Sequence, residues 1–421
     1  MADLWELTKK AKAGNVEAQM TVARAYKYGK GVNYDESAAL KWFKMAAEQG
    51  DAEGAYQTAK LLPNFLEDVD KDKLNPEVIS YLKTAAEKGH VKAQIDYALY
   101  QPGYYAPLTT HNIDLEERFF WLTKAAEQDN AEAMRELGMT YYNKPNADHI
   151  HTDYEKAVFW LTKAAEKDDA EAKYYLAECY RLERGGEYDA EKLFHLYKEA
   201  AEAGFEEAMG QVGVCYLHDI GTEYTEDEEE HAREAVYWFR KGAEHQDPDL
   251  ESCYQLGLCL LYGTGTEVNE KEALEYFHEA VSWAKIYRTE VPKAEYMLGE
   301  CYYEGHGTDV DYNEAVYWFE QAAEKNHAMA LYMLGECYFH GHGVRTNRKK
   351  ALKYYHRVVD IPDLEKGFEE NEGALYSLGF CYANGLGTEK NMLKAVYWYS
   401  KAEDLGSSEA REELDKILER K

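Results

Sequence analysis

The chain has 421 residues, more than one compact hydrophobic core usually serves, so either several domains or an elongated repeat array is expected. Only 8 residues are Pro, and no Pro- or Ser-rich linker separates globular units, which favours the array. The formal net charge of −31 repels phosphate backbones and anionic membrane surfaces, so we expect no nucleic acid partner.

The same charge attracts basic proteins, although it equally suits the solubility of a long array with a large surface. No stretch of about 18 apolar residues occurs, so we expect no membrane insertion and a cytoplasmic protein. The N-terminal segment MADLWELTKKAKAGN has no apolar core of signal-peptide length. A signal peptide that had been removed would leave a similar start, so secretion stays open.

One sequence pattern returns along nearly the whole chain. Residues 1–17 contain LWELTKKAKAGN, which is similar to a lone second helix of a helix pair and is predicted to cap the array. Residues 18–410 are predicted to form ten repeats, whose successive starts lie 36 to 44 residues apart. These starts fall near residues 18, 55, 93, 133, 172, 208, 252, 294, 330 and 374.

Each repeat contains two apolar stripes with helical spacing. The first stripe recurs at i, i+4, i+7, i+8 and i+11, and it ends at a Gly-His-Gly or similar turn. In the eighth repeat it consists of Ala294, Leu298, Cys301, Tyr302 and Gly305. The second stripe consists of Ala315, Trp318, Phe319, Ala322 and Ala323. A short Gly-containing loop between two helices predicts an antiparallel pair.

Glycine recurs inside the first helix, where it costs about 1 kcal/mol relative to Ala. Six first helices carry it one place after the stripe Leu or Val, at Gly138, Gly213, Gly257, Gly299, Gly335 and Gly379. We therefore expect a bulky aromatic ring of the second helix to lie against the bare backbone. The Trp or Tyr at the second position of that stripe, such as Trp318 or Tyr354, is the expected occupant.

The chain ends with SSEAREELDKILERK, which reads as one amphipathic helix, and residues 411–421 are predicted to cap the array. The predicted fold class is therefore all-α. It is an α/α superhelix, or solenoid, of about ten stacked antiparallel helix pairs with capping helices.

Two motifs resemble those of the Sel1-like repeat family, which is related to the tetratricopeptide repeats. They are an L-G-x-x-Y-x-x-G-x-G run, seen as LGECYYEGHG from Leu298, and a W-F/Y-x-x-A-A-E run, seen as WFEQAAE from Trp318. The resemblance covers essentially the whole chain. It implies a curved right-handed superhelix and a scaffold or adaptor role, and bacterial members often serve host interaction, secretion or regulatory complexes.

Six of the 7 cysteines occupy one stripe position in successive repeats, at Cys179, Cys215, Cys259, Cys301, Cys337 and Cys381. Equivalent positions of packed helices lie about 10 Å apart, too far for a disulfide. We expect buried, reduced thiols, Cys253 included, which favours a reducing compartment.

No residues with catalytic or metal-binding spacing occur. His306, His340 and His342 lie in the Gly turns without Cys or carboxylate ligands at metal-motif spacing, so we expect solvated turn histidines and no metal. Neither a nucleophile motif nor a phosphate-binding Gly-rich loop is found. We predict that the chain is not an enzyme and holds no cofactor.

The face of the first helices opposite the stripe is predicted to form a concave binding surface, because aromatic anchors carry most interface energy. The candidate residues are Tyr296, Glu300, Tyr303, Tyr332, Glu336, Phe339, Tyr376, Phe380, Tyr254 and Leu258. For any single residue, packing against the next repeat explains the pattern equally well.

We predict a scaffold or adaptor that binds another protein on this acidic and aromatic surface. A basic partner suits the net charge, and we expect a monomer. The alternative is an inhibitor or immunity-type protein that neutralises a basic toxin enzyme.

Overall fold

The computed structural model describes residues 2–65, 75–99, 115–142, 153–225, 227, 229–361 and 369–419. Within these ranges the regular elements are helices, and no β-strand occurs. The chain divides into two compact units, Met1–Ala203 and Gly204–Lys421.

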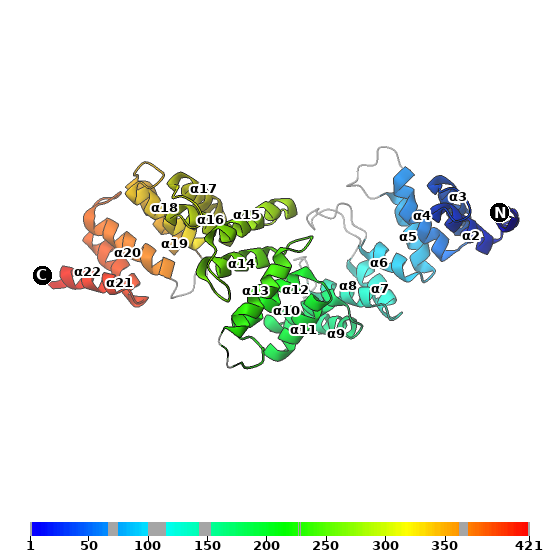
Figure 1. Cartoon of the computed structure of the whole chain (residues 1–421), viewed down its shortest axis with the longest axis horizontal. Helices are drawn as coiled ribbons and strands as arrows, with labels where there is room; N and C mark the ends of the chain where they lie inside the picture. The colour runs from blue at the N-terminus through cyan, green and yellow to red at the C-terminus, as the bar shows by residue number, and fades with distance from the viewer. Residues whose placement is uncertain are drawn as a thin grey trace. The chain divides into compact units, whose positions relative to one another are not determined.

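The first unit consists of a lone helix followed by helix pairs in which consecutive helices pack together (Figure 1). Its helices are α1 (Ala2–Lys12), α2 (Val16–Tyr28), α3 (Glu36–Glu48), α4 (Ala52–Leu61) with a 3₁₀ turn (Leu62–Phe65), α5 (Pro76–Glu87), α6 (Val91–Leu99), α7 (Leu115–Ala126), α8 (Ala131–Tyr142), α9 (Tyr154–Ala165), α10 (Ala170–Arg181) and α11 (Ala190–Glu202).

The second unit continues the same arrangement of pairs and ends with a lone helix. Its helices are α12 (Glu206–Leu217), α13 (Glu230–Ala243), α14 (Leu250–Tyr262), α15 (Glu270–Tyr287), α16 (Pro292–Glu304), α17 (Tyr312–Glu324), α18 (Ala328–His340), α19 (Arg348–Val359), α20 (Glu369–Asn384), α21 (Met392–Asp404) and α22 (Ser408–Glu419).

The predicted all-α class and the solenoid of helix pairs are confirmed, with ten pairs in the described part of the chain between α1 and α22. The division into residues 1–17, 18–410 and 411–421 stays a prediction. Residue 1 and residues 420–421, at the ends of the two predicted caps, lie outside the described residues.

Short polar and glycine signals fix the helix ends. Many helices begin after an Asp or Asn whose side chain accepts a backbone N–H bond, as Asp311 does from Glu314 N at 3.2 Å. α16 ends at Gly305, which has φ +85° and donates its N–H to Cys301 O at 2.8 Å. The turn falls at a glycine because residues with an L side chain rarely adopt this φ.

Five of the six glycines inside the first helices receive an aromatic ring, but from a different residue than expected, whereas Gly138 receives Leu161. A Cβ on Gly299 would lie 2.4 Å from Phe319 Cδ1, and one on Gly335 would lie 2.3 Å from Tyr355 Cε1. The occupant is thus the residue after the predicted Trp318 or Tyr354. The prediction was wrong by one place, because adjacent helix positions point about 100° apart.

Trp318 instead packs toward the preceding pair. It joins a buried cluster formed mainly by α13 to α16, and its ring lies 5.7 Å from that of His278 on α15. Phe319 belongs to the next cluster, with residues of α17 to α20. Trp318 therefore packs between successive pairs, whereas Phe319 packs between the two helices of its own pair and against the next one.

The second glycine of the turn brings successive pairs close together. Gly307 has φ +70°, and a Cβ there would lie 2.3 Å from the backbone oxygen of Glu270 at the start of α15. The Glu270 side chain accepts the Gly307 N–H at 3.1 Å and contacts His306 Nδ1 at 3.0 Å. His342 Nδ1 similarly lies 2.7 Å from the hydroxyl of Tyr303. Both histidines thus have polar partners within the fold, and the His306 side chain still keeps 38% of its surface exposed.

All 7 cysteines are free and buried, as predicted. Burial raises the pKa of the Cys337 thiol to about 12, with Glu336 adding to the effect, so the thiol stays protonated at neutral pH. Among the described residues, no helix combines the length and apolar character that a membrane span requires.

Candidate functional site

A cavity of about 250 Å³ opens between two neighbouring first helices of the second unit, α18 and α20. We call it the first-helix groove. Its walls are formed by Tyr332, Glu336, Phe339 and His340 of α18, Tyr355 of α19, and Tyr376, Ser377 and Phe380 of α20.

Helical periodicity explains why these side chains meet. The α18 positions follow i, i+4, i+7 and i+8, which places them on one side of the helix. Tyr376 and Phe380 are likewise one turn apart on α20. The stripe residues of both helices are buried on the opposite side, as Leu334 and Leu378 are, so the groove residues are left at the surface.

Glu336 lies at the centre of the polar part of the groove. Its Oε1 accepts a hydrogen bond from the Tyr355 hydroxyl at 2.7 Å, and its Oε2 lies 3.4 Å from His340 Nε2. The Glu336 side chain keeps 24% of its surface exposed. Burial and the Glu336 charge raise the pKa of Tyr355, so the hydroxyl keeps its proton. Its hydrogen bond holds the Glu336 carboxylate in place.

Aromatic rings form the rest of the walls. The ring of Phe380 lies 6.3 Å from that of Phe339 and stacks at 6.4 Å on that of Tyr376. Tyr332 packs over Gly373, where a Cβ would come within 3.2 Å of its hydroxyl oxygen. Burial raises the pKa of Tyr332 to about 12, which keeps this hydroxyl neutral.

Five of the ten predicted binding residues thus meet in one cavity, namely Tyr332, Glu336, Phe339, Tyr376 and Phe380. Three others lie on α16, where the two tyrosines contact the following pair. Tyr296 stacks on the ring of His327 at 5.1 Å, and the Tyr303 hydroxyl lies 2.7 Å from His342 Nδ1. Burial raises the pKa of Glu300, partly offset by a hydrogen bond from Tyr296.

The remaining two predicted residues lie on α14, away from the groove walls. Tyr254 is half-buried and its ring lies 6.2 Å from that of Phe277, with Lys293 Nζ 5.7 Å from the Tyr254 ring centroid. Burial raises the pKa of Tyr254 to about 12. Leu258 packs against the buried cluster of α13 to α16. Both have partners within the fold.

Three groove residues were not predicted: His340, Ser377 and Tyr355. His340 lies one turn after Glu336, and Ser377 lies three residues before Phe380, so the i+3 and i+4 periodicity of the predicted residues would have included both. Tyr355 comes from the second helix. It reaches Glu336 because Gly335 leaves room for its ring. This contact was not predicted because the sequence pattern placed Tyr354, and not Tyr355, against Gly335.

The size of the groove limits what it can hold. Its volume is below the range of about 300–1,000 Å³ typical of small-molecule pockets, so it suits one anchoring side chain of a larger ligand. Among the described residues, no three His, Cys, Asp or Glu side chains group as metal ligands.

Comparison with known proteins agrees with this architecture. A crystal structure of c5321, a protective antigen of uropathogenic Escherichia coli strains with an SLR fold, matches with a TM-score of 0.77 and 25% identity, over 98% of this chain and 82% of that one. A Sel1 repeat protein from Oxalobacter formigenes matches with a TM-score of 0.54 and 22% identity, over 80% and 90% of the two chains, which supports the fold alone. No curated protein matches the chain in sequence.

The family model for the Sel1 repeat matches nine segments, which together cover most of the chain. They are residues 16–51, 91–130, 131–169, 170–205, 206–247, 250–282, 292–327, 328–357 and 373–407. Proteins built from such repeats generally mediate protein–protein interactions. The chain belongs to the Sel1 repeat family.

Proposed function

We propose that this chain is a non-catalytic scaffold or adaptor that holds a protein partner, and that the first-helix groove receives an anchoring side chain of that partner. The observation that supports this most is the groove itself, in which two neighbouring first helices combine aromatic rings with one oriented carboxylate. Concave sites of this composition are where interface energy concentrates.

The chemistry of the walls favours a Lys or Arg side chain as the anchor. Glu336 offers a partly exposed carboxylate, and the ring of Tyr376 offers a face on which a cation is attracted, whereas the guanidinium of Arg348 already lies 5.5 Å from the Phe339 ring centroid. The net charge of −31 would speed the approach of a basic partner. The inhibitor alternative rests on this charge alone.

The test compares groove and control variants in a quantitative pull-down from native lysate. We expect the unmodified chain to retain a partner that the double variant Phe339→Ala with Phe380→Ala releases. Truncating one hot-spot side chain of an interface costs about 2 kcal/mol of binding free energy. The matched control is Tyr317→Ala with Tyr397→Ala. These two aromatic residues lie on second helices and are 47% and 54% exposed.

Loss of the same partner from the control variant but not from the groove variant would contradict the proposal. Binding isotherms with the purified partner would then give the magnitude. If that partner is a basic enzyme whose activity disappears in the complex, the chain is an inhibitor rather than an adaptor.

A further inference from the structure

A basic stretch interrupts this acidic chain in its second unit. Between Glu336 and Asp360 no Asp or Glu occurs, whereas six cationic side chains do: Arg345, Arg348, Lys349, Lys350, Lys353 and Arg357. These six side chains contribute +6 to the net charge of −31, so the rest of the chain carries a net charge of −37. A local reversal of sign in so acidic a chain calls for a physical explanation.

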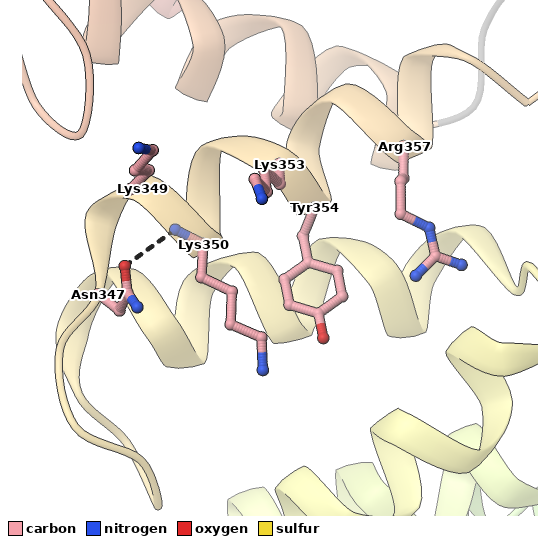
Figure 2. Close-up of a pocket in the computed structure, with 6 residues that line it drawn as sticks. All are labelled: Asn347, Lys349, Lys350, Lys353, Tyr354 and Arg357. Carbon is pink, nitrogen blue, oxygen red and sulfur yellow. Dashed lines mark hydrogen bonds between the residues drawn. The ribbon is translucent and has the colours of Figure 1, made fainter.

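Most of these cations gather around an open pocket of about 440 Å³ on α19, a second helix (Figure 2). We call it the α19 pocket. It is lined by Asn347, Lys349, Lys350, Lys353, Tyr354 and Arg357. The lining residues lie on α19 and at its N-cap, and none of them lines the first-helix groove.

Two of the cations are held in position. Lys350 Nζ lies 3.9 Å from the Tyr338 ring centroid and 5.6 Å from that of Tyr354. Arg357 donates hydrogen bonds to Ala323 O at 2.9 Å and Asn326 Oδ1 at 3.1 Å. As Figure 2 shows, Lys350, Tyr354 and Arg357 project to the same side of α19. The pocket thus places a neutral ring between two fixed cations.

The other cations are poorly compensated. Lys349 and Lys353 are exposed, lie one turn apart and form no ion pair with any described residue. The ion pair between Lys350 and Glu320 spans 3.9 Å. Like charges four residues apart destabilise a helix by about 0.2–0.5 kcal/mol. This repulsion is not offset within α19, because the helix has no acidic residue.

The position of these charges adds to the cost. Arg348, Lys349 and Lys350 occupy the first turn of α19, at the positive end of the helix dipole. Most other second helices have an acidic first turn, as α15 does with Glu270 and Glu272. An anion bound over α19 would relieve both the repulsion between side chains and the dipole effect.

We propose that the α19 pocket binds an acidic segment of a partner protein, a short run of Glu and Asp side chains. α19 has 12 residues and is about 18 Å long, which matches a few carboxylates. A nucleic acid or a membrane would extend beyond the patch, and a chain whose remainder carries −37 would repel it. Tyr354 and the alkyl stems of the lysines supply apolar contact between the carboxylates.

The test measures fluorescence anisotropy of a labelled octaglutamate peptide with the full chain at about 50 mM salt, where charged contacts are weakly screened. We expect saturable binding that weakens as salt is added. Lys349→Glu with Lys353→Glu should weaken it at least about tenfold. The matched control, Lys271→Glu with Lys285→Glu on α15, changes the net charge equally and should keep the affinity within about twofold.

A second readout guards against misfolding. Lys349→Gln with Lys353→Gln removes the repulsion without adding charge, so this variant should melt no lower than the unmodified chain while still losing peptide affinity. Octaglutamate should raise the melting temperature of the unmodified chain and not that of the variant.

The proposal is overturned if octaglutamate shows no saturable binding, or if the α15 control loses affinity as much as the α19 variant does. Tighter binding of a 20-nucleotide single strand, or of phosphatidylserine vesicles, would assign the pocket to another class of ligand. Salt-sensitive self-association that the α19 variant abolishes would make a second copy of this chain the occupant.

Discussion

The hydroxyl groups of two buried tyrosines, at equivalent positions in neighbouring pairs, meet opposite environments. Tyr355 donates to Glu336 at 2.7 Å. The hydroxyl of Tyr399 is buried without a hydrogen-bond partner among the described residues. At the place of Glu336 the last pair has Phe380, which cannot accept a hydrogen bond. The two tyrosines therefore form a natural comparison of a satisfied with an unsatisfied group.

We predict that Tyr355→Phe lowers the free energy of unfolding by about 1–3 kcal/mol, because it leaves the half-buried Glu336 carboxylate without its donor. Tyr399→Phe should be neutral or stabilising by up to about 1 kcal/mol, since it removes an unpaired polar atom. Urea unfolding of both variants measures the difference. Equal losses would show that the two hydroxyls have the same surroundings.

At this scale the sequence predicted the composition of the core better than its contacts. The shared stripe position of the cysteines predicted burial correctly. The ring against Gly335 was assigned to Tyr354 instead of Tyr355, because both neighbours are aromatic and periodicity alone does not say which points inward. Because of this one-residue error, the hydrogen bond from Tyr355 to Glu336 was not predicted either.

At the scale of the helix, α18 begins with an unusual cap. His327 Nδ1 accepts a hydrogen bond from Ala330 N at 3.3 Å, which requires a ring nitrogen without a proton. Tyr296 covers the ring by stacking at 5.1 Å. Burial, with a smaller contribution from Lys293, lowers the pKa of His327 to about 4 from the ordinary value of 6.5.

The stability that this cap contributes depends on pH. Between pH 6.5 and about 4 the unfolded chain binds a proton at His327 while the folded chain does not, so acidification favours unfolding. We predict that lowering the pH from 7.5 to 4.5 costs the unmodified chain about 2–3 kcal/mol more than His327→Asn. Asn is a good cap that does not titrate. Urea unfolding at the two pH values checks this, and parallel losses would contradict it.

The helix pairs themselves were predictable because several signals agree. Apolar periodicity, Asp or Asn at the start and Gly at the end all indicate the same helices, as in α16 and α17. The role of the second turn glycine was not predictable. Its close approach to the start of the previous second helix, seen at Gly307, is a contact between pairs that no single repeat reveals.

At the scale of the whole molecule, the pairs within each compact unit pack against their sequence neighbours, as expected of a repeat array. Positions that are equivalent in sequence therefore differ in surroundings wherever the next pair differs. Tyr303 and Tyr332 illustrate this, because His342 of the following turn engages Tyr303, whereas Tyr332 lies over Gly373 beside a cavity. The sequence predicted which residues share this face of the first helices and could not predict which of them line a cavity.

The most direct test of the central claim, that the first-helix groove holds the protein partner, is site-specific photo-cross-linking. A benzoylphenylalanine replaces Phe339 or Phe380 in the groove, or Tyr317 or Tyr397 on the second helices as controls. We predict that both groove positions cross-link to the same partner protein and that the controls do not. Cross-links to that partner from Tyr317 or Tyr397, with none from Phe339 or Phe380, would contradict the account.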